Sequence, residues 1–419
     1  MNKKKLAYPI FILLVTFSFL SAVPSQVVAA QSSESSPPSG IVVVDSLGSM
    51  GQVSSLALDS NNYPHLSYYD SDQGHLKYAY WDGAKWVKTT VDSNNIVGKD
   101  SSLLLDSNGY PCISYYDILN GDLKYAHWNG ERWRLQTVDI QGKVGQFSSL
   151  ALDANDNPRI SYYDETNHRL KYAHWTGSRW SIQVVDSGKV GQYCSLALDS
   201  NGTAHISYYD ATHESLKYAQ ANGASWKIQT VDSSSTVGIG TSLAIDSKGM
   251  PHISYIDYYS YYTKYARYNG ANWVIERVSS GYFAGTSTSL VLDLNDTPHV
   301  AFQDTLNYDL IYATRIAPNW NPKVVDSNGN VGVFPCLKLD AYEQPHISYN
   351  DYDGCRLKYA SGFANLLSGG LPQGTADPDV SQQDSEVNSY YLVFAGIVVL
   401  IAVALAVIAF KKYRTKPSA

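Results

Sequence analysis

Residues 101–117, SSLLLDSNGYPCISYYD, and residues 123–133, LKYAHWNGERW, contain the pattern that decides how this chain folds. Short runs of apolar, β-branched and aromatic residues alternate with the Gly, Asn, Asp and Pro that tight turns need. Runs such as HISYYD carry large side chains on both faces, which suits strands buried between neighbouring sheets. We expect four strands in this unit, at 102–106, 112–117, 123–128 and 133–139.

The same unit recurs seven times. An Asp closes the first strand of each unit, and the spacings between these residues are 47, 47, 46, 47, 47 and 47. A second Asp and a Tyr keep the same register, and a period near 47 falls among the repeat lengths of β-propellers. The three series are Asp59, Asp106, Asp153, Asp199, Asp246, Asp293 and Asp340; Asp70, Asp117, Asp164, Asp210, Asp257, Asp304 and Asp351; and Tyr78, Tyr125, Tyr172, Tyr218, Tyr265, Tyr312 and Tyr359.

The repeats are offset in a way that indicates a closed ring. Six units end in a fourth strand opened by Trp, whereas the seventh stops after its third strand, near Ser361. The missing strand is found at the other end of the chain, as IVVVD at residues 41–45. Pairing it into the last unit removes two exposed sheet edges. We therefore predict an all-β, seven-bladed β-propeller over residues 40–361, closed by an N-terminal strand.

Both ends of the chain resemble targeting segments. Three early lysines, an apolar run and small residues up to Ala30 predict a secretory signal peptide at 1–30, with an uncleaved anchor as the alternative. Residues 390–410 carry no charge and are long enough to cross roughly 30 Å of hydrocarbon as a transmembrane helix. The basic tail at 411–419 is then cytoplasmic, and the propeller stands outside the cell. Between these segments we expect a leader at 31–39 and a flexible stalk at 362–389.

A cell-wall sorting signal is the competing interpretation of the C-terminal region. LPQGT at 371–375 resembles the pentapeptide that sortases cleave, but its last two residues are transposed and it lies well before the apolar run. The formal charge of −7 and the pI near 5.8 argue against a nucleic-acid partner, which needs a basic surface.

Four cysteines are too few for a disulfide scaffold. Cys336 and Cys355 are expected at the same end of the seventh unit, in an exported domain where a disulfide can form. A bond between them and two buried thiols are the two alternatives. Cys112 and Cys194 are expected to be free, because they lie in different units.

Residues that recur in all seven units are interpreted first as structural. The Asp after each first strand is expected to accept backbone N–H groups in its turn. Calcium is the alternative at Asp153 and Asp293, although these runs are too short for a calcium loop. The histidines that open the second strands are scattered around the ring, which excludes one tetrahedral cluster of them. No metal or other cofactor is expected.

Function is expected where the units differ, which is mainly in the loops between second and third strands. The fifth loop places Tyr258, Tyr259, Tyr261 and Tyr262 beside Asp257, a combination that suits stacking against sugar rings and bonding to hydroxyls. A hydrophobic plug between blades is the competing interpretation. Arg169 and Arg356 are the arginines of these loops and are further candidate ligand-binding residues.

The units resemble the repeats of sialidase-like and fucose-lectin-like propellers over about residues 41–361. The Asp-box motif of sialidases does not carry over, because Leu104 and Ala151 stand where that motif has Ser. The resemblance implies a cell-surface binding or adhesion module, with a surface glycan or an extracellular protein as partner. A structural envelope protein without a small ligand is the first alternative. The second is a sialidase-like glycoside hydrolase, for which Arg169 and Arg356 lie too far apart, in units three and seven.

Two N-x-S/T sequons, at Asn201 and Asn295, are candidate glycosylation sites. Both fall between first and second strands, so we expect them on the face opposite the variable loops.

Overall fold

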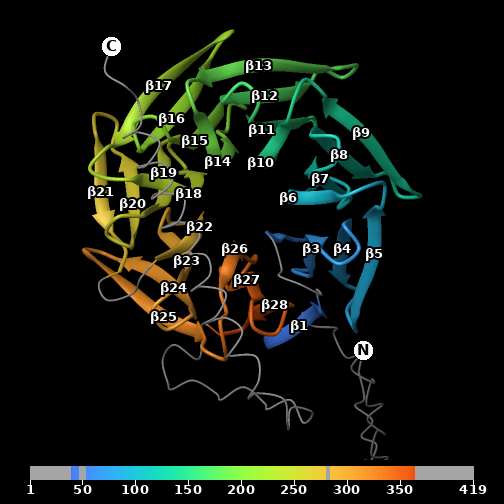
Figure 1. Ribbon diagram of the computed structural model, residues 1–419. Coiled ribbons are helices and arrows are strands. Elements are labelled where there is room, and N and C mark those ends of the chain that lie inside the picture. The colour runs from blue at the N-terminus through green and yellow to red at the C-terminus, as the bar shows by residue number, and fades with distance from the viewer. Residues whose placement is uncertain (1–38, 47–52, 280–283, 364–419) are drawn as a thin grey trace, which may run out of the picture.

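The computed structural model of the chain describes residues 39–46, 53–279 and 284–363. These residues form seven four-stranded antiparallel sheets, which surround a central axis as the blades of a propeller (Figure 1). The predicted seven-bladed, all-β fold is therefore confirmed. Among the described residues, no helix is long and apolar enough to cross a membrane. The signal peptide, the transmembrane helix and the tail predicted at the two ends, with nearly all of the leader and stalk, lie outside the described residues.

Each blade is built from four consecutive strands, and the first strand of each blade lies nearest the axis (Figure 1). Blade one is β2–β5, blade two β6–β9, blade three β10–β13, blade four β14–β17, blade five β18–β21, blade six β22–β25, and blade seven β26–β28 with β1.

The first strands are β2 (Ser55–Leu58), β6 (Val97–Leu105), β10 (Val144–Leu152), β14 (Val190–Leu198), β18 (Val237–Ile245), β22 (Ala284–Leu292) and β26 (Val333–Leu339). The second strands are β3 (Pro64–Asp70), β7 (Pro111–Asp117), β11 (Pro158–Asp164), β15 (Ala204–Asp210), β19 (Pro251–Asp257), β23 (Pro298–Asp304) and β27 (Pro345–Asp351).

The third strands are β4 (His75–Trp81), β8 (Asp122–Trp128), β12 (Arg169–Trp175), β16 (Ser215–Asn222), β20 (Tyr262–Tyr268), β24 (Asp309–Ile316) and β28 (Arg356–Ser361). The outer strands are β5 (Trp86–Asp92), β9 (Trp133–Asp139), β13 (Trp180–Ser187), β17 (Ser225–Asp232), β21 (Trp273–Arg277), β25 (Asn319–Asp326) and β1 (Gly40–Ser46).

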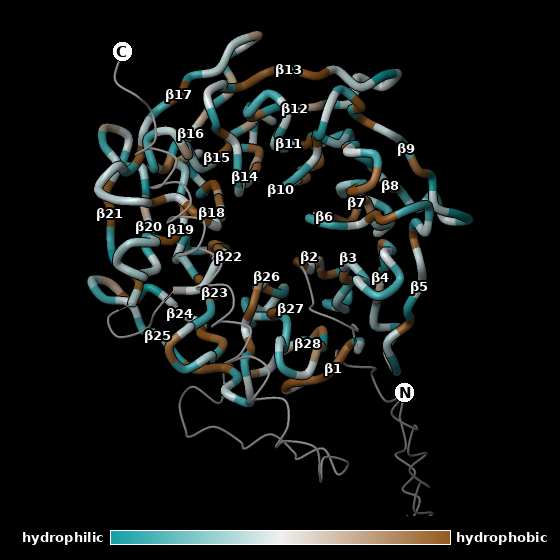
Figure 2. Tube along the Cα trace, in the orientation of Figure 1, coloured by the Kyte–Doolittle hydropathy of each residue, from teal (hydrophilic) through white to brown (hydrophobic). Residues whose placement is uncertain are grey.

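The N-terminal strand closes the ring as predicted. β1 pairs antiparallel with β28, with Ile41 opposite Ala360 and Val42 opposite Tyr359. β1 is among the more apolar strands, whereas polar and apolar residues are mixed along the other blades (Figure 2). Val44 of β1 is buried against residues of both blade seven and blade one. The two ends of the propeller are therefore held together by backbone pairing and by a shared core.

A belt of hydroxyl groups joins the first strands around the axis. In six blades a serine hydroxyl accepts a hydrogen bond from a backbone N–H of the next blade, at 2.9–3.1 Å. The seventh link is made by Cys336, whose Sγ accepts the N–H of Leu56 at 3.3 Å. The six serines are Ser55, Ser102, Ser149, Ser195, Ser242 and Ser289.

This belt explains the cysteines. All four cysteines are free in the structure. Of the two alternatives for Cys336 and Cys355, the structure therefore has the thiols and not the disulfide, and both thiols are partly exposed rather than buried. Cys336 lies inside the sheet, opposite Ser348, and its sulfur contacts blade one. Cys355 ends the turn that follows Asp351, and its Sγ lies 3.7 Å from the Tyr352 carbonyl oxygen. The two side chains are thus engaged with different neighbours.

A polar latch joins the outer part of neighbouring blades. At most boundaries an Asp of an outer strand accepts the hydroxyl of a buried Tyr in the next blade, as Asp232 does from Tyr255 at 2.7 Å. A lysine, here Lys264, also reaches that carboxylate. Blade six has Phe302 and Ile311 at the matching positions, and Ser279 replaces the Asp. All three members of the latch are therefore replaced together at one boundary.

An aromatic contact at every boundary extends the propeller beyond its predicted end. Six boundaries pair a Tyr edge-to-face with the Trp that opens an outer strand, as Tyr78 does with Trp133 at 5.5 Å. At the seventh boundary Phe363 takes the place of Trp, with its ring 5.6 Å from Tyr312. Phe363 is only 5% exposed. The stalk was predicted to begin at residue 362, but Phe363 belongs to the propeller core.

The recurring Asp and His residues have the structural roles expected of them. Asp106 Oδ1 accepts the N–H groups of Asn108 and Tyr110, both at 2.9 Å. Asp153 and Asp293 make the same turn bonds, and their remaining oxygens face Arg159 and His299. These donors do not fit a calcium site. Five buried histidines bond a Tyr hydroxyl through Nδ1, namely His65, His205, His252, His299 and His346.

Candidate functional site

One face of the ring carries the seven turns between second and third strands, and we call it the turn face. Each turn has four residues, at 71–74, 118–121, 165–168, 211–214, 258–261, 305–308 and 352–355. Backbone bonds tie several of them to the preceding inter-blade loop, as when Tyr258 N–H donates to the Thr236 carbonyl at 2.9 Å. The side chains of these variable residues are thus presented from a fixed backbone.

The blade-five turn presents three tyrosines to solvent. Tyr258, Tyr259 and Tyr261 are 54%, 81% and 45% exposed. The rings of Tyr258 and Tyr261 lie 6.0 Å apart at 43°. A plug between blades would bury these rings, so the competing interpretation from the sequence does not fit this turn.

Asp257 and Tyr262 were expected in the same site, but both make contacts within the protein instead. Asp257 is buried and accepts bonds from Ser235 Oγ at 2.7 Å and Ser260 N at 3.1 Å. Burial acts to raise its pKa, but these bonds and Lys264, 2.9 Å away, outweigh that effect and lower the pKa to about 2. The Tyr262 ring is covered by the Arg277 guanidinium, 3.0 Å from the ring centroid.

Two further tyrosines that the sequence analysis missed lie in the turns of the next two blades. Tyr308 is 50% exposed and Tyr352 is 41% exposed. Blades five, six and seven are consecutive around the ring. We call Tyr258, Tyr259, Tyr261, Tyr308 and Tyr352 the tyrosine crescent. Their position could have been predicted from the repeat, because each lies in the turn of its own blade that corresponds to the tyrosine-rich turn of blade five.

Two members of the crescent stand where the backbone is unfavourable for a side chain. The last residue of every one of these turns has a positive φ, and Gly74 and Gly121 fill this position in blades one and two. Tyr261 and Tyr308 have φ of 56° and 63°. A non-glycine residue there costs roughly 1–2 kcal/mol. His168, Glu214 and Cys355 adopt the same conformation in three other turns. The conformation therefore belongs to the repeat and does not by itself distinguish the tyrosines.

A central cavity of about 560 Å³ opens beside the crescent. Its wall is formed by the first strands and is rich in hydroxyls, and Tyr352 of the crescent also lines it. Rings of Phe147 and Tyr193, 4.6 Å apart, form an aromatic part of the wall. This volume and this mixture of aromatic and hydroxyl groups fall in the range of small-ligand sites.

Asp100 and Lys99 supply the charged groups among the described lining residues. A bulge in β6 gives Asp100 a φ of 52°. Its Oδ2 accepts the N–H of Phe147 from the next blade at 3.0 Å. Burial raises the pKa of Asp100, which that hydrogen bond and Lys99 oppose. The single carboxylate among the described residues of this wall does not provide the acid and base pair of a glycosidase.

Arg169 and Arg356 are not brought together. Arg169 begins β12 in blade three, whereas Arg356 begins β28 in blade seven. Arg356 forms an ion pair with Asp351 of its own blade at 3.3 Å. These two residues therefore do not form the arginine cluster that a sialidase needs.

The sequons lie on the face opposite the crescent. Asn201 and Asn295 are exposed and occupy turns between first and second strands. Their expected placement is confirmed, and their use by a glycosyltransferase stays a prediction.

The sequence matches no protein-family profile and no curated protein sequence. Among solved structures, an ulvan lyase of a polysaccharide lyase family superposes with a TM-score of 0.54 at 12% identity, covering 80% of this chain and 99% of the lyase. Virginiamycin B lyase from Staphylococcus aureus gives 0.53 at 9% identity, covering 76% and 98%. The fucose-binding lectin of Aleuria aurantia gives 0.46 at 15% identity, covering 66% and 96%. Similarity at these identities concerns the fold alone: the chain is a repeat β-propeller, here with seven blades.

Proposed function

We propose that this chain is a carbohydrate-binding propeller that holds its ligand on the turn face. The observation that carries the proposal is the set of three tyrosines at 258, 259 and 261, whose side chains are about half or more exposed to solvent. Aromatic rings that remain in solvent offer flat apolar faces to the C–H side of a sugar, and their hydroxyls can bond to it.

The neighbouring cavity supports the same class of ligand. Its wall combines aromatic rings with serine and threonine hydroxyls and has a single carboxylate among the described lining residues. Such a wall suits a neutral, hydroxyl-rich molecule better than a strongly charged one. The tyrosine crescent and the cavity together offer room for more than one sugar unit.

The location of the protein belongs to the proposal as well. We propose that residues 1–30 direct export and that residues 390–410 anchor the chain, because each segment has the length and flanking charge that its role requires. The chain is then a single-pass membrane protein whose propeller lies outside the cell, where surface glycans are available.

A glycan array probed with the purified, labelled chain tests the proposal. Binding to a defined class of saccharides is the expected result. Absence of binding to every saccharide favours the structural envelope protein instead. Hydrolysis of fluorogenic glycosides by the same preparation would favour the sialidase-like enzyme.

A further inference from the structure

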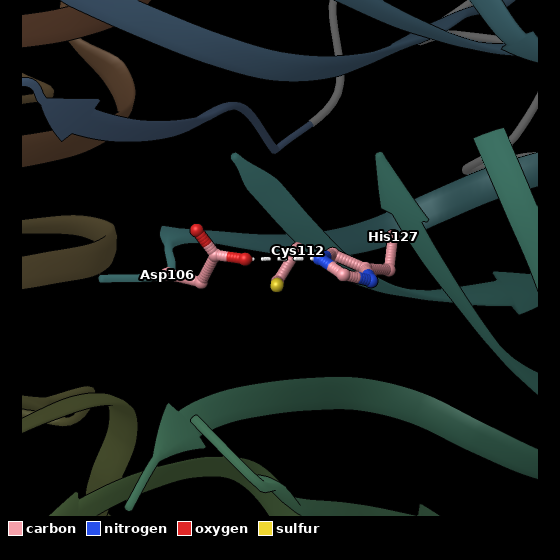
Figure 3. Close-up of side chains that lie close together, drawn as sticks. All are labelled: Asp106, Cys112 and His127. Carbon is pink, nitrogen blue, oxygen red and sulfur yellow. Dashed lines mark hydrogen bonds and ion pairs between the residues drawn. The ribbon is translucent and has the colours of Figure 1, made fainter. Parts of the chain in front are cut away.

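A carboxylate, a thiol and an imidazole meet in blade two (Figure 3). Asp106 follows β6, and Cys112 of β7 lies directly opposite His127 of β8. The Oδ2 atom of Asp106 is 3.0 Å from His127 Nε2. The three ligand atoms all lie within 4.8 Å of one another. Among the described residues no other set of three such side chains converges in this way.

The other blades show how this corner departs from the repeat. Where blade two has Cys112, five blades have a His that bonds a Tyr hydroxyl and faces the turn Asp. In blade two a thiol stands in that position and an imidazole lies opposite it on the third strand. Blade three also has an imidazole there, His174, but it lies opposite Arg159. The residues that match His127 are Tyr80, His174, Gln220, Arg267, Thr314 and Ser361.

We propose that Asp106, Cys112 and His127 bind one Zn²⁺ ion. Carboxylate oxygen, imidazole nitrogen and thiolate sulfur are the ligands that Zn²⁺ takes in proteins, and three of them with an added water complete its tetrahedron. Tetrahedral ligand atoms around Zn²⁺ are roughly 3.3–3.8 Å apart. Side-chain rotations that move atoms by about 1 Å therefore convert the observed cluster into a coordination shell. The sequence predicted no metal because the histidines are scattered around the ring. That reasoning concerned histidines alone and left out a set made of one Asp, one Cys and one His.

The surroundings favour a cation. Two backbone N–H groups hold Asp106 Oδ1, which leaves Oδ2 directed at the cluster, and such bonds orient metal ligands. Asp156 of blade three adds a second carboxylate nearby, where it accepts the N–H of Ser107 at 3.1 Å. The side chain of His127 is 35% exposed, so an ion and its water can enter past it.

Binding must remove the thiol proton. The Zn–S bond forms as the Sγ–H proton passes to solvent, so one proton is released for each ion bound.

Titration of the full chain with Co²⁺, kept reduced and free of other metals, tests the site. We expect one Co²⁺ per chain, a thiolate-to-cobalt charge-transfer band, and loss of that band when Zn²⁺ is added. Cys112→His and His127→Gln each introduce a residue that another blade carries at that position, so both variants are expected to fold. Each should abolish the band, whereas Cys355→Ser, which removes a more exposed thiol, should retain it.

Two results would overturn the proposal. The first is a wild-type chain that binds no Co²⁺ with a thiolate band. The second is a band that persists in Cys112→His, which would place the metal on another thiol. Circular dichroism of each variant distinguishes loss of the site from loss of the fold.

Discussion

Replacement of Phe363 by Ala tests whether the last described residue completes the propeller. Phe363 is 5% exposed and packs against Tyr312. Truncating a buried Phe to Ala costs about 3–5 kcal/mol. Because Phe363 lies at the edge of the propeller core, we expect the lower part of this range, about 3 kcal/mol. For a domain of roughly 320 residues, that loss lowers Tm by about 5 °C.

Urea unfolding followed by tryptophan fluorescence measures this loss, because six of the boundary contacts contain a Trp. Phe363→Trp is the matched control, since it installs the residue that the other boundaries carry, and it should keep most of the wild-type stability. A Phe363→Ala chain that unfolds at the wild-type urea concentration would refute the assignment of Phe363 to the core.

Three further predictions concern the contacts between blades and the buried histidines. A chain that lacks residues 40–46 leaves β28 with an unpaired edge, and its Tm, measured by circular dichroism, should fall well below that of the intact chain. Asp232→Asn weakens the latch to Tyr255 and should cost about 1–3 kcal/mol in urea unfolding; replacing Asp232, Tyr255 and Lys264 together by the Ser, Phe and Ile of blade six should cost less than the sum of the single changes. Burial lowers the pKa of His205 and of four equivalent histidines, while Asp199 and its equivalents act in the opposite direction. Below about pH 6.5 the unfolded state therefore binds more protons than the folded state. Each such histidine then removes up to about 1.4 kcal/mol of stability per pH unit. The urea midpoint should therefore be lower at pH 5 than at pH 7.

Each of these has a clear contrary result. An unchanged Tm without β1 contradicts closure by the N-terminal strand. Additive costs for the three latch residues contradict their action as a unit. An equal or higher midpoint at pH 5 contradicts the neutral, buried state of the histidines.

The repeat was sufficient to predict the blades and their closure. A nearly constant spacing fixes the register of equivalent strands, and the offset of one strand left β1 as the partner of β28. Phe363 escaped prediction because it fills the place of a Trp without belonging to the outer strand that normally carries it. The place of Cys336 in the belt could have been predicted, because it stands 47 residues after Ser289, in register with the serine series. This register is a better guide to its partner than its proximity in sequence to Cys355.

The candidate site was predicted only in part, because exposure depends on the turn rather than on residue type. Tyr259 and Tyr262 look alike in the sequence, yet one lies in the turn and the other begins a strand under Arg277. Asp257 resembled a ligand-binding carboxylate, but its oxygens serve the turn. Tyr308 and Tyr352 were single aromatic residues in their loops and became part of a site only when neighbouring blades were placed side by side.

The most direct test of carbohydrate binding on the turn face compares two exposed tyrosines on opposite faces. Tyr259 is 81% exposed on the turn face, and Tyr342 is 76% exposed in a turn between first and second strands. Isothermal titration with the strongest saccharide from the array gives the affinity of each alanine variant. An aromatic contact is worth about 0.5–1.5 kcal/mol, so Tyr259→Ala should weaken binding by up to about tenfold and Tyr342→Ala should leave it unchanged. Equal affinities for the wild type and Tyr259→Ala, or a loss confined to Tyr342→Ala, would contradict the assignment of the ligand to the turn face.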